Sequence, residues 1–220
     1  MSGKTLLKSL LKRSSHKIVA FSLFSLGSFS IASPSFAASL DVGSWARSGD
    51  VSQTAGQATL TNASADGSDD VINYNVSGNN PSGISNLETF LGVSQGTLGL
   101  DATEGSAIQT ALNVIAGDTF SFDWNFTTFD TRSIDRAFVT IGNSVFNLDG
   151  TSGRFSRTFD TPGTYNIGIG VIDVDDFTNS SRLTLSNANQ EPVPEPLTIL
   201  GSLTALGFGA SLRRRFRKKA

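Results

Sequence analysis

The sequence predicts an all-β fold, an antiparallel two-sheet sandwich of jelly-roll type with one short helix. Short runs of alternating apolar and polar residues recur through the middle of the chain. Turn-forming stretches rich in Gly, Asp and Pro separate these runs, and only one segment has convincing helical spacing. We expect the sandwich to occupy residues 38–188, followed by a polar linker at 189–192.

The clearest strand is "TFSFDWNF" at 119–126. Its alternation places Phe120, Phe122, Trp124 and Phe126 on one face and polar residues on the other, the period of a half-buried strand. Because Trp124 is in phase with three phenylalanines, we predict core packing for it rather than a place in a sugar-stacking platform.

A second strand is predicted at 164–174, "TYNIGIGVIDV". Gly168 and Gly170 lie opposite its apolar residues, which indicates that another group approaches the backbone closely there. Four weaker alternating runs complete the predicted strands: 58–63, 71–76, 136–142 and 182–188.

The helix is predicted at "SNLETFLG". Ser85 and Glu88 have the spacing of a capping box, in which each side chain caps the other's backbone N–H. Leu87, Phe90 and Leu91 share an apolar face, and Gly92 ends the helix.

Residues 1–37 have the three regions of a secretory signal peptide. A basic stretch precedes an apolar run from Ile18 to Ile31, and small residues then lead to a predicted cleavage between Ala37 and Ala38. The alternative is an uncleaved N-terminal anchor, for which the apolar run is short. We therefore expect the chain to be exported by the Sec machinery.

The charge is distributed unevenly along the chain. All 19 Asp and Glu lie between Asp41 and Glu195, together with six arginines and no lysine, so this stretch has a net charge of −13. A nucleic-acid-binding protein needs clustered cations against phosphate, and this composition excludes that class. An acidic surface is instead typical of a soluble domain that attracts divalent cations.

Beyond residue 37 the chain has neither histidine nor cysteine, because the single histidine is His16. Catalysis by Ser-His-Asp or Cys-His groups and zinc binding through these residues are therefore excluded for the sandwich. The remaining enzymatic possibility is a pair of carboxylates, as in glycoside hydrolysis. No sequence feature pairs two of the acids, so we expect a protein that is not an enzyme and keep a carboxylate-dependent hydrolase as the alternative.

Two features are candidate ligand sites. Asp173, Asp175 and Asp176 cluster at a strand end, and such oxygen-rich clusters suit calcium; the alternative is a plain acidic loop. Trp45, in the Gly- and Ser-rich segment 38–56, is either a sugar-stacking side chain or an anchor at the edge or in the core of the sandwich.

The C-terminal segment 193–219 has three parts in order: "VPEP", an apolar run at 197–212, and a basic block. At 1.5 Å per residue the 16-residue apolar run extends about 24 Å as a helix, shorter than the hydrocarbon core of a bilayer. The basic block would hold the C-terminus in the cytoplasm. The run is therefore expected to be a short transmembrane helix.

This segment closely resembles the PEP-CTERM sorting signal of Gram-negative bacteria. The resemblance implies that Pro194, Glu195 and Pro196 form the recognition motif and that Arg213, Arg214 and Arg215 form the stop-transfer cluster. It also implies that a membrane-embedded exosortase cleaves near the motif. The protein would then cross the inner membrane transiently and reach the cell surface or extracellular matrix.

The middle of the chain resembles the sandwich domains common in PEP-CTERM proteins, which are similar to galactose-binding-like jelly rolls. The shared stretches include "AGDTFSFDWNF", "DRAFVTIG" and "YNIGIGVIDVDD". The resemblance implies a fold more than an activity. We therefore expect a non-catalytic module for extracellular polysaccharide, with calcium as a candidate cofactor. The alternative outside catalysis is a structural or adhesion component of the matrix without a small ligand.

Overall fold

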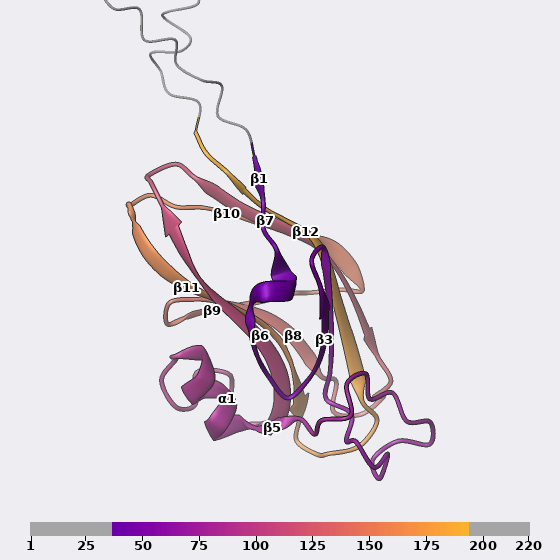
Figure 1. Ribbon diagram of the computed structural model, residues 1–220. Helices are drawn as coiled ribbons and strands as arrows, with labels where there is room; N and C mark the ends of the chain where they lie inside the picture. Colours follow the sequence, from indigo (N-terminus) through magenta and orange to yellow (C-terminus); the bar gives the residue numbers. More distant parts are fainter. Residues whose placement is uncertain (1–36, 194–220) are drawn as a thin grey trace, which may run out of the picture. The chain divides into compact units, whose positions relative to one another are not determined.

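The structure is a computed structural model in which residues 37–193 are described (Figure 1). Most of the predicted signal peptide, the sorting motif at 194–196 and the helix at 197–212 lie outside these residues. Within 37–193, no helix is long and apolar enough to cross a membrane.

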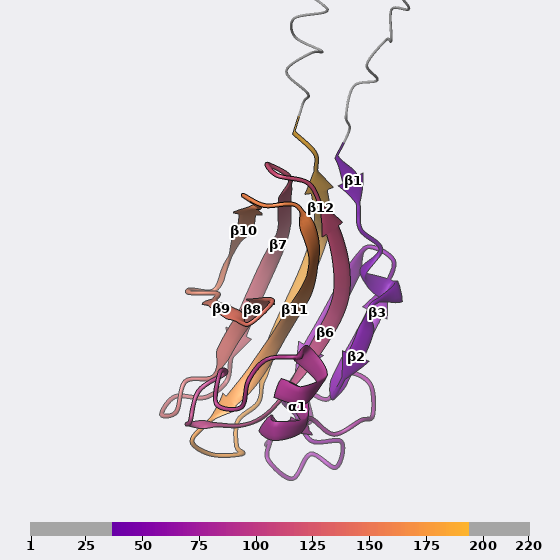
Figure 2. The same ribbon diagram turned by 90° about the vertical axis from the view of Figure 1, so that its left-hand side faces the viewer.

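Two antiparallel sheets face each other and confirm the predicted sandwich (Figures 1 and 2). Sheet A has the order β10 (Ser152–Thr158), β7 (Thr119–Thr128), β12 (Ser181–Glu191), β4 (Gln57–Thr61) and β3 (Asp50–Thr54), with β1 (Ala38–Ser39) beside β12. Sheet B has the order β2 (Ala46–Ser48), β6 (Ala102–Val114), β11 (Gly163–Val174), β8 (Arg136–Ile141) and β9 (Ser144–Asn147), with β5 (Ser82–Gly83) beside β6. The eight strands β4 and β6 to β12 have the strand order of a jelly roll.

The main core lies between the two sheets. Phe120, Phe122, Trp124 and Phe126 of β7 all point into it, as the alternation predicts. The inward residues of β11 and β12 pack against them. Burial of each large apolar side chain contributes about 1.5–3 kcal/mol, so this layer is the main source of stability.

The run at 71–76 is predicted as a strand but is a loop. Val71 is fully exposed, so it contributes nothing to the core. The amide of Asn75 donates to the carbonyl oxygens of Ala63 and Asn79 and accepts from the N–H of Gly78. These side-chain bonds to the backbone stabilise a turn in place of a sheet ladder.

The predicted linker at 189–192 is wrong for its first three residues, because β12 extends to Glu191. Asn189, Gln190 and Glu191 pair with the first residues of β7, after an irregularity beyond Ser186. Their polar side chains indicated a linker, yet an antiparallel sheet with one solvated face accepts polar residues on that side.

Helix α1 (Ile84–Leu91) packs on the outer face of sheet B (Figures 1 and 2). Leu87 and Leu91 join Phe138 and Ile172 in a second, smaller apolar cluster on that face. The glycines of β11 permit this contact: a Cβ at Gly168 would overlap the Leu91 side chain. The predicted close approach at these glycines is therefore confirmed.

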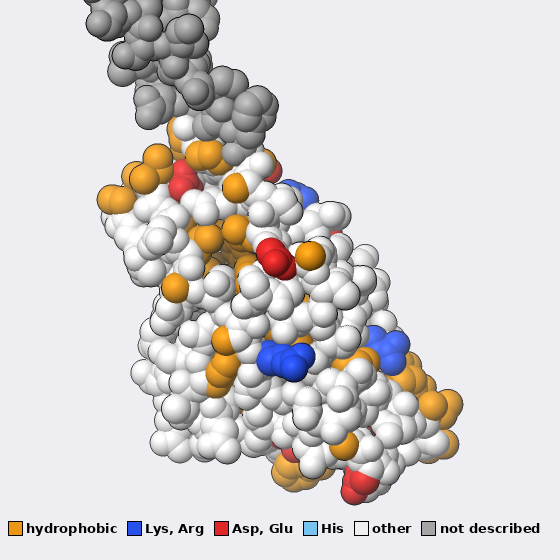
Figure 3. Space-filling model, in the orientation of Figure 1, with side chains coloured by type: hydrophobic (Ala, Val, Ile, Leu, Met, Phe, Trp, Pro, Cys, Tyr) orange, Lys and Arg blue, Asp and Glu red, His pale blue; other side chains and the backbone are white. Residues whose placement is uncertain are grey.

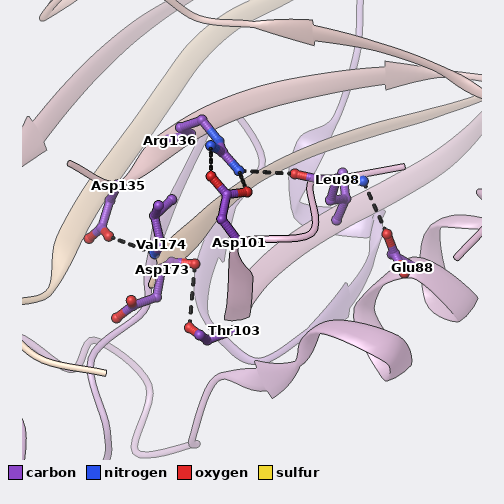
Figure 4. Close-up of polar contacts among 8 residues, drawn as sticks. All are labelled: Glu88, Leu98, Asp101, Thr103, Asp135, Arg136, Asp173 and Val174. Carbon is purple, nitrogen blue, oxygen red and sulfur yellow. Dashed lines mark hydrogen bonds and ion pairs between the residues drawn. The ribbon is translucent and has the colours of Figure 1, made fainter. Parts of the chain in front are cut away.

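The predicted capping box is wrong. The helix begins two residues earlier than the capping box implies, with Gly83 rather than Ser85 at the N-cap and no side-chain cap, so Ser85 is inside the helix. Glu88 instead accepts the backbone N–H groups of Gly96 and Leu98, at 3.0 Å each, and ties the following loop to the helix. Figure 4 shows the bond to Leu98. Gly92 ends the helix in the left-handed conformation, as predicted.

Candidate functional site

Trp45 is buried, so of the two roles predicted for it the core anchor is confirmed and the sugar-stacking side chain is wrong. Only 7% of the residue is exposed, and its ring lies 6.4 Å from that of Phe120 in the main core. The short helix Val42–Ser44 turns the chain inward before it, and Gln53 Nε2 donates to the carbonyl oxygens of Val42 and Trp45. The indole therefore stabilises the sandwich rather than presenting a binding surface.

The three aspartates predicted to bind calcium point to different places. Asp173 is 1% exposed on β11, whereas Asp175 and Asp176 lie in the turn that follows. Asp176 accepts two hydrogen bonds from Thr178, one from its N–H and one from its hydroxyl. Across residues 37–193, no three Asp, Glu, His or Cys side chains are grouped so that they could hold a metal ion. The predicted calcium triplet is therefore not formed.

A buried pair of carboxylates closes one end of the interior. Asp135 and Asp173 are 2% and 1% exposed, and both accept from Nδ2 of Asn62, at 2.8 and 3.3 Å. The other oxygen of Asp135 accepts the N–H of Val174 at 3.2 Å (Figure 4). Oδ1 of Asp173 has no hydrogen-bond partner among the described residues.

The pKa values of the carboxyls at this end are raised towards neutral pH. Burial first, and then the charges of Asp135, Asp176 and Glu104, together raise the pKa of Asp173 to about 8. Burial also raises the pKa of Asp135 to about 6 and that of Glu104 to about 7. Asp50 is equally buried, and its carboxylate oxygens accept from the hydroxyls of two residues and from two backbone N–H groups.

An ion pair adjoins this end of the sandwich. The guanidinium of Arg136 makes two 2.7 Å bonds to the carboxylate of Asp101, and one of its nitrogens also donates to the carbonyl oxygen of Leu98 (Figure 4). These bonds lower the pKa of Asp101 to about 2. The pair fixes Arg136 in place, so its charge is already compensated where it meets the cleft described next.

A cavity of about 510 Å³ lies where β7, β8 and the β9–β10 connection meet; we call it the edge cleft. Phe126, Ala137 and Leu148 contribute apolar surface to its lining. Its polar lining includes five side chains with no hydrogen-bond partner within residues 37–193: Asn125, Thr127, Asn147, Asp149 and Thr151. The cleft therefore offers uncommitted amide, hydroxyl and carboxylate groups above an apolar floor.

The outer face of sheet A, which we call the polar face, leads into the edge cleft through Asn125. In register with Asn125, a row of polar residues crosses five strands: Ser152, Asn125, Thr184, Thr59 and Ser52. A neighbouring network is already ordered, because Arg154 donates to Asp123 and Ser121, and Asn187 also donates to Asp123. The polar face is thus a continuous layer of hydrogen-bonding groups.

Aromatic residues stand at one end of the polar face. The rings of Tyr74 and Phe129 stack with their centroids 4.1 Å apart, and the guanidinium of Arg182 lies 5.6 Å from the Tyr74 centroid. All three are half-buried. Such a planar surface can contact the apolar face of a sugar ring.

The edge cleft does not contain two facing carboxylates. Both oxygens of Asp135 accept bonds from Asn62 and Val174, so its carboxyl is turned to the interior even though the residue lines the cleft. Asp149 is exposed on the rim and is the other acid among the described lining residues. The arrangement fits hydrogen bonding to a ligand better than the two-carboxylate chemistry of a glycosidase.

No pattern in the sequence predicts the edge cleft. Its residues come from three separate stretches of the chain, and each alone looks like solvated strand or turn. The one available signal was the alternation at 119–126, which places Asn125 on the solvent side.

Comparison with known proteins gives fold-level similarity alone. No protein-family model matches the chain, and no curated protein matches it either. The solved structures that are similar include the C-terminal CBM6 of LamC, a marine laminarinase from Zobellia galactanivorans (TM-score 0.32, 12% identity, 69% of this chain and 99% of that chain). They also include the N-terminal cellulose-binding domain of β-1,4-glucanase C from Cellulomonas fimi (TM-score 0.34, 15% identity, 74% and 99%). Similarity at this level carries no inference about activity, so the fold assignment rests on the strand order.

Proposed function

We propose that the sandwich is a non-catalytic module that binds polysaccharide at the edge cleft and along the adjoining polar face. The observation that carries this proposal is the uncommitted polar rim of the cleft. Asn125, Asn147 and Asp149 are exposed, come from different strands or turns, and have no partner within the described residues. Convergent amides and carboxylates above an apolar floor match the alternating hydroxyls and C–H faces of sugar rings.

The charge of the domain favours a neutral polymer. Residues 37–193 contain six arginines against eighteen acids, and a negative domain repels an acidic chain. On the face drawn in Figure 3, basic side chains are isolated groups rather than a patch. Arg136 and Arg154 are also engaged by Asp101 and Asp123. A hydroxyl-rich neutral polysaccharide is therefore the ligand class that we expect.

Affinity electrophoresis of the full-length chain tests this proposal. Native gels would contain hydroxyethylcellulose, mixed-linkage β-glucan, galactomannan or starch, with alginate and polygalacturonate as acidic polymers. We expect retardation by a neutral polymer, weakened about tenfold in the double variant N125A/N147A because two sets of hydrogen bonds are lost. A chelator should leave retardation unchanged.

The matched control is Asn166→Ala, which removes an exposed strand amide from sheet B, away from the cleft. It should bind like the unmodified chain. Retardation by none of the polymers, or equal weakening in the control, would overturn the proposal in favour of a matrix component without a small ligand. The burial of Trp45 is the observation that favours this second candidate.

We also propose that the chain is exported and processed at its C-terminal sorting segment. The support is the sequence pattern, in which "VPEP" precedes a short apolar run and a basic block. Replacing Pro194, Glu195 and Pro196 with alanine should leave Arg213–Ala220 attached to the protein. Intact mass of the surface-localised protein measures this, and equal trimming of variant and unmodified chain would refute the motif.

A further inference from the structure

We infer that the edge cleft is one end of an elongated groove that binds an extended oligosaccharide rather than a single sugar. This inference rests on the proposed function. It adds the part of the edge that the ligand covers and the chain length that the site requires.

The other end of the groove is a second cavity of about 240 Å³, which we call the aromatic hollow. It lies between the β8–β9 turn and the β10–β11 turn, and its lining includes Phe146, Phe159 and Tyr165. Arg157 and Asp160 add polar groups of both signs. The hollow therefore has the same combination of apolar surface and hydrogen-bonding groups as the edge cleft.

Two charged side chains of the hollow are not used in the structure. The guanidinium of Arg157 lies 5.4 Å from the centroid of Phe146, and within residues 37–193 it makes no hydrogen bond or ion pair. The carboxylate of Asp160 is exposed and likewise has no partner in that part of the chain. Arg157 is thus oriented by an aromatic ring while its donors stay free for a ligand.

Both cavities lie along the same open edge of the sandwich. β9 and β10 are the last strands of their respective sheets, and they lie on the same side of the molecule (Figure 2). Asn147 of β9 lines the edge cleft, and Phe146, the residue before it, lines the hollow. The chain runs from Thr151, which lines the cleft and directly precedes β10, along β10 to Arg157 and Thr158, which line the hollow.

Aromatic rings occupy the interval between the cavities. Phe146 and Phe155 meet edge-on with centroids 5.9 Å apart, and both are half-buried. The seven residues of β10 extend about 20 Å at the rise of a strand. That distance corresponds to a short oligosaccharide and exceeds a single ring, so one chain lying along β10 would contact both cavities and the rings between them.

The test measures affinity against ligand length. The neutral polymer that most retards the full-length chain in gels is partly hydrolysed and separated from the disaccharide to the hexasaccharide, and each fraction is titrated by calorimetry. We expect affinity to rise with length and then level off, with one oligosaccharide bound per chain. Arg157→Ala should weaken the longest fractions about tenfold and leave the shortest unchanged, because only long chains reach the hollow.

Three variants complete the design. Arg157→Lys keeps the positive charge but loses the planar guanidinium with its paired N–H donors. Its affinity for the longest fractions should therefore lie between those of the unmodified chain and R157A. Arg47→Ala removes an exposed arginine from β2, at the opposite edge of sheet B, and should have no effect. N125A/N147A should weaken the fractions of every length, because these residues line the edge cleft.

The outcomes separate the two proposals. If no polymer retards the unmodified chain, both the proposed function and the groove are refuted. If a polymer binds but affinity is independent of length, or R157A matches the unmodified chain at every length, the groove alone is wrong. Two oligosaccharides per chain would likewise replace one groove by two separate sites.

Discussion

The outer faces of the two sheets differ in what covers them. On sheet B, Leu87 and Leu91 of α1 pack on Phe138 and Ile172, so this face belongs to the apolar interior. On sheet A, the corresponding outward residues are mostly Ser, Thr, Asn and Gln and are exposed or half-buried. One fold thus carries one face that stabilises it and one face that remains available for a ligand.

The difference follows from the outward residues of the strands. β11 places Gly168 and Gly170 on the outer face of sheet B, which allows Leu91 and Phe138 to approach its backbone. β7 places Ser121, Asp123 and Asn125 at the equivalent positions of sheet A, where an apolar helix would leave them without water. Glycine on one strand and polar residues on the other therefore determine which face is covered.

The largest expected effect comes from removing the contact between α1 and sheet B. Leu91→Ala should lower the free energy of unfolding by about 3 kcal/mol, because a fully buried leucine leaves a cavity. Thr184→Ala on the polar face should change it by less than about 0.5 kcal/mol. Urea denaturation of both variants measures this, and similar losses would contradict the contrast between the faces.

The next effect tests whether the polar groups that cost stability are the buried ones rather than those of the polar face. The folded-state pKa of Asp173 is raised to about 8, above its unfolded value, so folding favours the protonated acid. Its contribution to stability is largest below about pH 4 and is lost as the pH rises towards 8. The unfolding free energy of the unmodified chain should therefore fall between pH 5 and pH 8.

Asp173→Asn should remove much of that fall and be more stable than the unmodified chain by about 2 kcal/mol at pH 8. Asp123→Asn is the control on the polar face, because hydrogen bonds from Asn187 and Arg154 lower the pKa of Asp123. Asp123→Asn should therefore change the pH dependence of the unfolding free energy only below about pH 4. Urea titrations at several pH values measure the unfolding free energy of each variant. If this free energy depends on pH in D173N as it does in the unmodified chain, the role of the buried pair is refuted.

A smaller effect is expected at the glycines under α1. Gly168→Ala should cost about 1–2 kcal/mol, because its Cβ would overlap the side chains of Leu91 and Thr140. Gly163→Ala, on the same strand, brings its Cβ no closer than 3.6 Å to Tyr165 and should be nearly neutral. Thermal unfolding distinguishes the two, and a neutral G168A would show that α1 is not closely packed on the sheet.

The smallest effect is expected on the polar face itself. Arg154→Met breaks the exposed bond to Asp123, which is 3.0 Å long, and should change stability by less than about 1 kcal/mol. Denaturation of both proteins in low and high salt measures this change in stability. A loss as large as that of L91A would mean that the polar face contributes to folding as much as the helix-covered face does.

Strands are predicted most reliably from the sequence where one of their faces is strongly apolar. The strands at 119–126 and 164–174 were recognised because aromatic or β-branched residues alternate there with polar ones or glycine. The longest strand, Ala102–Val114, was not predicted. Its first half is buried on both faces and contains small residues such as Gly105 and Ala107, so apolar and polar residues do not alternate there.

The sequence by itself determined the sandwich, the negative charge and the exclusion of His- and Cys-based catalysis, because these follow from local periodicity and composition. Only the tertiary structure decided that Trp45 is buried, that Asp173 meets Asp135 through Asn62, and that Asn125 and Asn147 share a cleft. The physical reason is distance along the chain. Jelly-roll strands alternate between sheets, so residues far apart in sequence become neighbours, and no local pattern records which ones meet.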